Sequence, residues 1–400
     1  MSGPSDKARF YLEQAVPQLQ EFKEKKIFSE DEIRTLVKKR SDFEHRVLGR
    51  GSQPVDFAKY AAWEISLEHL RKKRCKRLQI KGSTAHSGQA RIFSIFDRGT
   101  KKHPGDIALW MSFLETAREA KATKKFKIVL TAALRLHPTK SELWLYAAKW
   151  SLQSEADMSG ARSYMQRGTR FCTRSKDLWI EYAKLEMIFL TKIAMRRKIL
   201  GLDASDDPDT DNEEEILEAN GFETSADVIA IPNFKPNTLR QSMVEGIVVD
   251  EEAKKDPMAT PALNGAIPLA IFDAARKQPF FCPSAAEDFF DMFAAFTQVN
   301  CLPKILLHVL DVMNELFPKD PSTSSCFVKQ SLVGLSPTSP EFPTALGIAL
   351  ERLNLSIENT ADKGLFMRKT RNWIESTLQV ADLDPGIEAV LGHTLRKLEG

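Results

Sequence analysis

The densest charge in this 400-residue chain lies in a short basic run. Six of the seven residues from 71 to 77 are cations: Arg71, Lys72, Lys73, Arg74, Lys76 and Arg77. Cations at this density can contact nucleic-acid phosphates or serve as a nuclear-import signal. No aromatic residue interrupts the run, so it does not predict stacking on single-stranded bases. The structural alternative is a solvated helix face.

A second charged segment has the spacing of a calcium loop. Asp207, Asp209, Asp211 and Glu218 match positions one, three, five and twelve of an EF-hand. Asn212 stands at the sixth position, where that loop needs glycine for its turn. We therefore predict no metal site. The nine acidic residues between 203 and 218 indicate a disordered loop or linker instead.

The remaining candidates for catalysis are weak. His103 and His137 each precede a proline, 34 residues apart, and a place at a helix C-terminus explains them. The five cysteines have no zinc-site or redox spacing, and no phosphate-binding glycine loop or nucleophile elbow occurs. The sequence therefore predicts no enzyme, with no catalytic residues, no cofactor and no metal.

The elements that position these residues repeat along the chain. Trp110, Trp144 and Trp179 are 34 and 35 residues apart, and each follows a leucine. A period of this length is typical of stacked helical hairpins, in which a small residue on the second helix leaves room for the aromatic rings of the first. The predicted repeat-core anchors are Phe57, Tyr60, Trp110, Phe113, Trp144, Trp179 and Tyr182, together with the small residues Gly99, Ala133 and Gly168.

Glutamates accompany two of these anchors. Glu64 and Glu186 each lie seven residues after the first aromatic of their copy, and we expect them at the edge of the buried stripe. The repeats are preceded by helix signals of their own. Ser29 and Glu32 form a capping box. In the helix that precedes this box, Pro17 predicts a kink or break.

The predicted fold class is all-α, an α-solenoid of helical hairpin repeats after an N-terminal helical region. We divide the chain into a helical region at 1–50, repeats at 51–202 with a basic insertion at 71–88, an acidic and proline-containing linker at 203–265, and divergent helical repeats at 266–400. Residues 1–200 carry 41 Lys and Arg against 22 Asp and Glu, and residues 201–400 carry 16 against 32. A basic first half indicates contact with nucleic acid or acidic protein surfaces, unless the charges are only uneven solvated faces.

Composition also bears on location. No run of 18 apolar residues occurs, so we expect no transmembrane helix, and residues 1–10 lack the apolar core of a secretory signal. The scattered cysteines fit reduced thiols, and we expect an intracellular chain.

The repeat pattern resembles the half-a-tetratricopeptide (HAT) repeat more than the tetratricopeptide repeat. The second aromatic follows three residues after the first, and two copies carry glutamate at seven. The likeness covers roughly residues 55–200 and extends faintly over 266–345. The copy at Trp144 departs from it, with Ala147 and Ser151 at the aromatic and glutamate positions.

The N-terminal region carries a more specific resemblance. The segments Tyr11-Leu-Glu-Gln-Ala-Val-Pro17, Ile27-Phe-Ser-Glu-Asp-Glu-Ile33 and Lys38-Lys-Arg-Ser-Asp-Phe-Glu-His-Arg46 resemble the U3 small nucleolar RNA-associated protein 6 family. That resemblance implies a scaffold subunit of the UTP-B subcomplex of the small-subunit processome, in the nucleus and nucleolus. It implies WD-repeat (β-propeller) protein partners, a hetero-oligomeric complex assembled with U3 snoRNA and pre-rRNA, and a role in early pre-18S rRNA processing and ribosome biogenesis.

Three other hypotheses stay open. The chain could bind RNA directly and without sequence preference, through residues 71–81 and the basic flank Lys121–Lys127. It could be a HAT-repeat scaffold of another RNA-processing complex, for splicing or 3'-end formation. A tetratricopeptide-like chaperone adaptor is the third, and the aromatic spacing argues against it.

Overall fold

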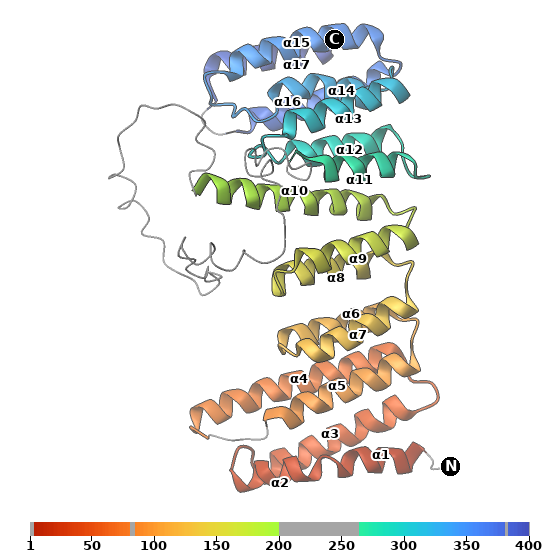
Figure 1. The fold of residues 1–400 in the computed structure, drawn as a ribbon. Helices are drawn as coiled ribbons and strands as arrows, with labels where there is room; N and C mark the ends of the chain where they lie inside the picture. Colours follow the sequence, from red (N-terminus) through yellow and green to blue (C-terminus); the bar gives the residue numbers. More distant parts are fainter. Residues whose placement is uncertain (1–3, 81–84, 200–263, 381–382, 400) are drawn as a thin grey trace, which may run out of the picture. The chain divides into compact units, whose positions relative to one another are not determined.

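The computed structural model describes residues 4–80, 85–199, 264–380 and 383–399, and every regular element in these ranges is a helix. Figure 1 shows the helices in chain order. Contacts between Cα atoms group the chain into two compact units, Met1–Cys172 and Thr173–Gly400. Within the described residues, no helix combines the length and the apolar character needed to cross a membrane.

The first unit begins with three helices, for which the sequence predicted the capped start of the third and an interruption at Pro17. They are α1 (Pro4–Glu13), α2 (Val16–Glu24) and α3 (Glu30–Leu48). Because Pro17 cannot supply a backbone N–H, one helix ends before it and the next begins around it. The capping box is confirmed, since the Ser29 hydroxyl accepts from the Glu32 N–H and the Glu32 carboxylate accepts from the Ser29 N–H. Gly49 caps the end of α3.

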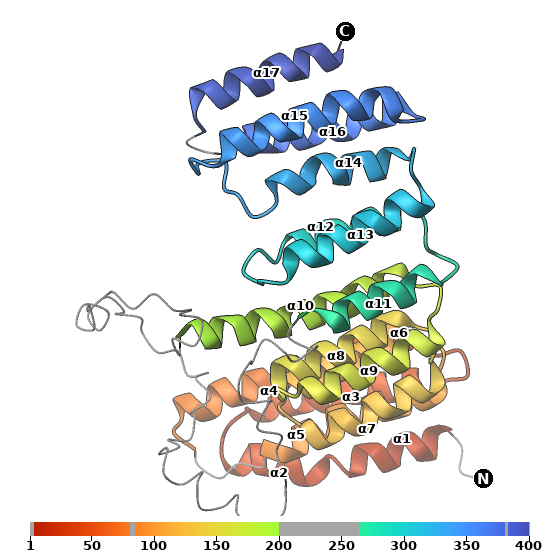
Figure 2. The ribbon, with the colours of Figure 1, turned by 45° about the horizontal axis from the view of Figure 1, so that its top comes forward.

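Three helix pairs follow in the first unit. They are α4 (Pro54–Arg77) with α5 (Ala85–Lys102), α6 (Ile107–Glu119) with α7 (Thr123–Leu136), and α8 (Ser141–Ser154) with α9 (Met158–Phe171). Each pair also contacts the next, α5 with α6 and α7 with α8. Figures 1 and 2 show these pairs as successive layers.

The predicted basic insertion at 71–88 begins inside a helix. Residues 71–77 form the last two turns of α4, which is simply longer than α6 and α8. Their helical conformation is favourable because Lys and Arg are good helix formers and cations suit a helix C-terminus. Residues 81–84, between α4 and α5, lie outside the described ranges.

The second unit is also built of packed helices. It contains α10 (Lys176–Ile199), α11 (Ala266–Arg276), α12 (Pro283–Ala294), α13 (Leu302–Leu316), α14 (Pro321–Lys329), the 3₁₀ turn η3 (Gln330–Leu332), α15 (Phe342–Asn359), α16 (Lys363–Leu378) and α17 (Pro385–Glu399). α12 packs on α13 and α14, and α14 packs on α15 and α16. The core of α12 consists of Phe289, Phe290 and Phe293, all fully buried, where the first half uses tryptophan.

The four-part division of the chain stays a prediction. Most of the predicted linker at 203–265, with the acidic run that has calcium-loop spacing, lies outside the described residues.

Candidate functional site

All ten residues predicted as repeat-core anchors are buried. The least buried, Trp179 and Tyr182, are 7% exposed. The small residue of the first pair has a clear steric reason, because a Cβ on Gly99 would lie 3.0 Å from Phe57 and 3.1 Å from Leu109. The second aromatic of the next copy, Phe113, stacks on Phe96 with ring centroids 5.1 Å apart. The anchors therefore make up the core between the helices of the repeats and are not available to a ligand.

The loops between helix pairs carry a hydrogen-bond pattern that repeats with the sequence. Trp110 donates its indole N–H to the carbonyl of Pro104 at 2.9 Å, and Trp144 donates to Pro138 at 2.8 Å. Each of these carbonyls also receives a donor from the far end of the same helix pair. His137 lies 2.7 Å from the Pro104 oxygen, and the Cys172 thiol donates to the Pro138 oxygen at 3.4 Å.

This pattern explains the period-matched histidines without catalysis. His137 caps the end of α7, as predicted for a helix C-terminus, and its ring fixes that end against the preceding loop. His103 instead contacts Phe57 edge-on, with ring centroids 5.7 Å apart. The loop carbonyls thus set the spacing of successive helix pairs.

A buried network of charges joins α3 to the first helix pair. Arg40 donates to the two carboxylate oxygens of Glu64 at 2.7 and 3.0 Å, and to the Gln18 side chain at 3.3 Å. A second set joins Arg98 to both oxygens of Glu44 at 2.7 and 2.9 Å. Pairs with two parallel N–H···O bonds are the strongest ion pairs in proteins, and they fix the relative orientation of the helices.

The network overturns one expectation. Glu64 and Glu186 were predicted at the edge of the buried stripe, yet they are 2% and 1% exposed. Glu64 can be buried because α3 supplies a guanidinium for it, and the sequence around Glu64 gives no sign of that partner.

Two groups that adjoin the network, Tyr60 and Arg91, have shifted pKa values. Burial, with the charges of Glu44 and Glu64, raises the pKa of Tyr60, which donates its hydroxyl to Glu44 at 3.0 Å. Burial also lowers the pKa of Arg91, and the nearby charge of Arg40 lowers it further. Because its ion pairs join α3 to both α4 and α5, we interpret the cluster as structural.

The basic run divides into buried and exposed members. Arg71 is 3% exposed and donates to both oxygens of Glu68 at 2.8 and 2.6 Å. Arg74 donates to both oxygens of Glu32 at 2.8 and 2.7 Å and lies over the Phe28 ring. The Arg71 contacts stay within α4, and the Arg74 contacts join α4 to the capped start of α3. The predicted phosphate or import contacts at Arg71 and Arg74 are therefore not supported.

The sequence contains a pattern that separates the buried cations of the basic run from the exposed ones. Glu64, Glu68, Arg71 and Cys75 follow one another at steps of four, three and four residues, and all four are buried. This is the helical period continued from Tyr60, so it indicated that the buried stripe of α4 runs on through the basic run.

The other four members of the run, Lys72, Lys73, Lys76 and Arg77, are exposed. The basic flank 121–127 also divides. Lys125 pairs with Asp97 at 2.6 Å, whereas Lys121 and Lys124 are exposed. Lys127 pairs with Glu155 at 2.5 Å.

Two hollows lie along the first unit. One, of about 90 Å³, lies between α4, α5 and the end of α6, and its lining includes Lys72, Gln89 and Ala120. The next, of about 420 Å³, lies between the end of α6, α7 and the end of α8, with Thr123 and Ser154 in its lining. Gln89 and Thr123, like Ala120 and Ser154, are 34 residues apart, so the hollows repeat with the helix pairs.

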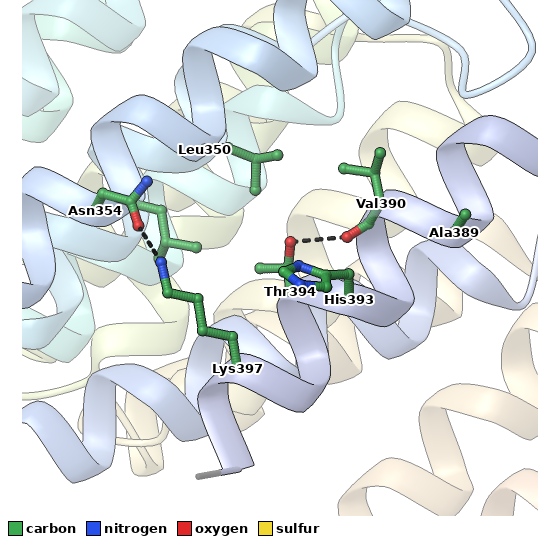
Figure 3. Close-up of a pocket in the computed structure, with 8 residues that line it drawn as sticks. Leu350, Asn354, Ala389, Val390, His393, Thr394 and Lys397 are labelled. Carbon is green, nitrogen blue, oxygen red and sulfur yellow. Dashed lines mark hydrogen bonds between the residues drawn. The ribbon is translucent and has the colours of Figure 1, made fainter.

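A third hollow lies in the second unit between α15 and α17. It has a volume of about 410 Å³, and Figure 3 shows Leu350 and Asn354 on one side and Val390, His393 and Lys397 on the other. The Lys397 ammonium donates to the Asn354 side chain at 3.4 Å. Its lining mixes aliphatic and polar groups, without a set of groups that converge on one point.

The described residues contain no group of three or more His, Cys, Asp or Glu side chains placed to hold a metal ion.

Comparison with known proteins gives the buried network a context. Residues 12–96 match a sequence model of the U3 small nucleolar RNA-associated protein 6 family. This segment contains Arg40, Glu44, Glu64 and the whole basic run. U3 small nucleolar RNA-associated protein 6 of Schizosaccharomyces pombe is 36% identical over 199 residues, which cover 49% of this chain and 41% of that protein.

The N-terminal half of the chain is thus similar to the U3 small nucleolar RNA-associated protein 6 family. The homologues of Mus musculus and Homo sapiens are 29% and 28% identical over 209 and 213 residues. Each match covers 52% of this chain and 35% of the relative. The matches therefore span well under half the length of these family members.

Proposed function

We propose that the chain is a non-catalytic scaffold subunit of the small-subunit processome, within the UTP-B subcomplex, and that its helix pairs form a HAT-repeat solenoid. It would bind other protein subunits, WD-repeat proteins among them, during early pre-18S rRNA processing and small ribosomal subunit assembly. The hetero-oligomeric complex would assemble with U3 snoRNA and pre-rRNA in the nucleolus.

The observation that carries this proposal is the regular spacing of the helix pairs in the first unit. The carbonyls of Pro104 and Pro138 each join a loop to both helices of the pair that follows it, and the Arg40–Glu64 ion pair joins α3 to the first helix pair. A stack held in this way presents the same exposed positions once per repeat. Repeat proteins use such extended surfaces to bind partners through many shallow contacts. The names of the relatives support the setting of the processome.

The test is affinity purification of the tagged full chain, with and without nuclease, followed by mass spectrometry and RNA sequencing. We expect β-propeller proteins that stay bound after nuclease treatment, together with U3 RNA in the untreated sample. Recovery of splicing or 3'-end factors instead would move the scaffold to another RNA-processing complex. Loss of every protein on nuclease treatment would contradict the scaffold.

A matched pair of variants tests whether the repeats carry the binding. Trp144→Phe keeps an aromatic ring in the core, whereas Trp144→Ala leaves a cavity and costs about 3–5 kcal/mol of folding free energy. Partner recovery should survive the first substitution and fall with the second. Equal recovery from both would place the binding outside the repeats. A fluorescent fusion that does not coincide with a nucleolar marker would contradict the proposed localisation.

A further inference from the structure

Six exposed cations lie on the last two turns of α4 and between the end of α6 and the first turn of α7, and Lys72 of α4 lines one hollow with the end of α6. We name this surface the basic edge, and it consists of Lys72, Lys73, Lys76, Arg77, Lys121 and Lys124. None of the six forms an ion pair with another residue in the described part of the chain. They differ in this from Arg71 and Arg74, whose charges are already neutralised by carboxylates.

The fold brings the two groups of cations together across about 45 residues of sequence. Lys72 and Ala120 line the same small hollow, and Lys121 follows Ala120 directly. The Gln89 side chain donates to the Ala120 carbonyl at 3.3 Å, which fixes the end of α6 against the start of α5. Figures 1 and 2 show the end of α4 and the α6–α7 turn on the same side of the stack.

The basic edge carries more positive charge than is needed to stabilise the C-terminal end of a helix. A helix C-terminus gains from one or two cations in its last turn, yet four stand free at the end of α4. Glu68 lies beside the hollow, but Arg71 already occupies both of its oxygens. Glu119 is the other carboxylate in the lining. The basic edge therefore attracts a polyanion.

We propose that the basic edge binds the phosphate backbone of a nucleic acid without reading its sequence. Five of the six cations are lysines, which act as point charges and impose no geometry on a phosphate. No aromatic residue of the basic run could stack on a base. The inference does not rest on the proposed scaffold function, because it needs no protein partner.

The test measures binding of the purified full chain to a labelled single-stranded RNA 20-mer at several salt concentrations. The test variant replaces the four α4 cations by glutamine: Lys72→Gln, Lys73→Gln, Lys76→Gln and Arg77→Gln. The matched control removes four other exposed cations that lack ion pairs in the described structure: Lys38→Gln, Lys39→Gln, Lys101→Gln and Lys140→Gln. The two variants have the same net charge, so a difference in their RNA binding depends on where the removed cations lie.

Each phosphate contact contributes about 0.7 to the slope of log affinity against log salt for a single strand, so the test variant should lose up to about 3 from that slope. We expect at least a tenfold loss of affinity at 0.15 M salt, equal for two unrelated RNA sequences, and little change in the control variant. The same binding measurement is made with a DNA 20-mer and with a poly-glutamate peptide. Similar loss with DNA is expected, because the phosphate is the shared ligand.

Equal slopes for the two variants would overturn the proposal, and so would a loss confined to one RNA sequence. Binding of poly-glutamate without binding of either nucleic acid would assign the edge to an acidic protein. If circular dichroism shows that the fourfold variant is unfolded, Lys72→Gln with Lys76→Gln replaces it, with an expected slope change of about 1.4. Because no other protein is present, this outcome is separate from the outcome of the purification experiment.

Discussion

Replacement of Arg40 by methionine tests the reasoning about the buried network most directly. The substitution keeps a long side chain but leaves the Glu64 carboxylate, 2% exposed, without its cation. Unit charges about 4 Å apart attract by about 4 kcal/mol at an effective dielectric constant of 20, and breaking a buried pair costs about 3–5 kcal/mol. The loss also relieves the repulsion between Arg40 and Arg91. We therefore expect the lower end of that range, about 3 kcal/mol.

Hydrogen exchange followed by mass spectrometry is the suitable assay, because unfolding of a repeat chain need not be two-state. Peptides from α3 and α4 report the local opening that the pair opposes. A loss of about 3 kcal/mol should accelerate their exchange by roughly a hundredfold. Arg34→Met is the matched control, since Arg34 lies on the same helix in a surface pair with Asp31 and should matter by less than about 1 kcal/mol.

A double variant completes the argument. When Glu64→Met is added to Arg40→Met, no buried charge is left unpaired, so the double variant should be more stable than Arg40→Met alone. Exchange in Arg40→Met within about threefold of the wild type would refute the reasoning. Strict additivity of the two single substitutions would refute it as well.

Three further outcomes are expected from measurements of unfolding. Trp144→Phe removes the indole donor but keeps the ring, and should cost about 1 kcal/mol by thermal denaturation, several-fold less than Trp144→Ala. Gly99→Ala pushes a Cβ against Phe57 and should lower the free energy of unfolding, measured with urea, by about 1–3 kcal/mol. An unchanged free energy would mean that the Phe57 ring moves aside. Glu32→Gln tests pH dependence: hydrogen bonds from Arg74 and the Ser29 backbone lower the pKa of Glu32 to about 2, so the stability it provides is present above about pH 4.5 and is lost as the pH falls toward 2. Because its side chain is 42% exposed, we expect a difference of about 1 kcal/mol at pH 7 that vanishes near pH 2, and a constant difference would contradict the assignment.

The features that could be predicted from the sequence are those with a local or periodic cause. The capping box at Ser29 and the break before Pro17 depend on a few neighbouring residues, so the residue types were sufficient. The helix pairs were predictable because Trp110, Trp144 and Trp179 recur at a fixed spacing. A pattern that repeats three times has few explanations.

What could not be predicted depends on contacts between distant segments. Arg40 follows two exposed lysines and resembles them in sequence, yet it is 1% exposed because Glu64 faces it from the next helix. The hollow beside Lys72 needs three helices to form, and the distance from Lys72 to Lys121 along the chain gives no hint that they flank one surface. Such pairings require the packing of the helices to be known.

The shared loop carbonyls restrict how such a chain can change its length. Pro104 and Pro138 each accept one donor from the first helix and one from the end of the second helix of the pair that follows, so a loop is satisfied only when a complete repeat follows it. A duplicated segment of 34 or 35 residues would bring both a new acceptor and the donors to fill the old one. Duplication of a single helix would leave a carbonyl without its second donor and shift every later anchor out of phase. The chain is therefore built to lengthen or shorten by whole repeats.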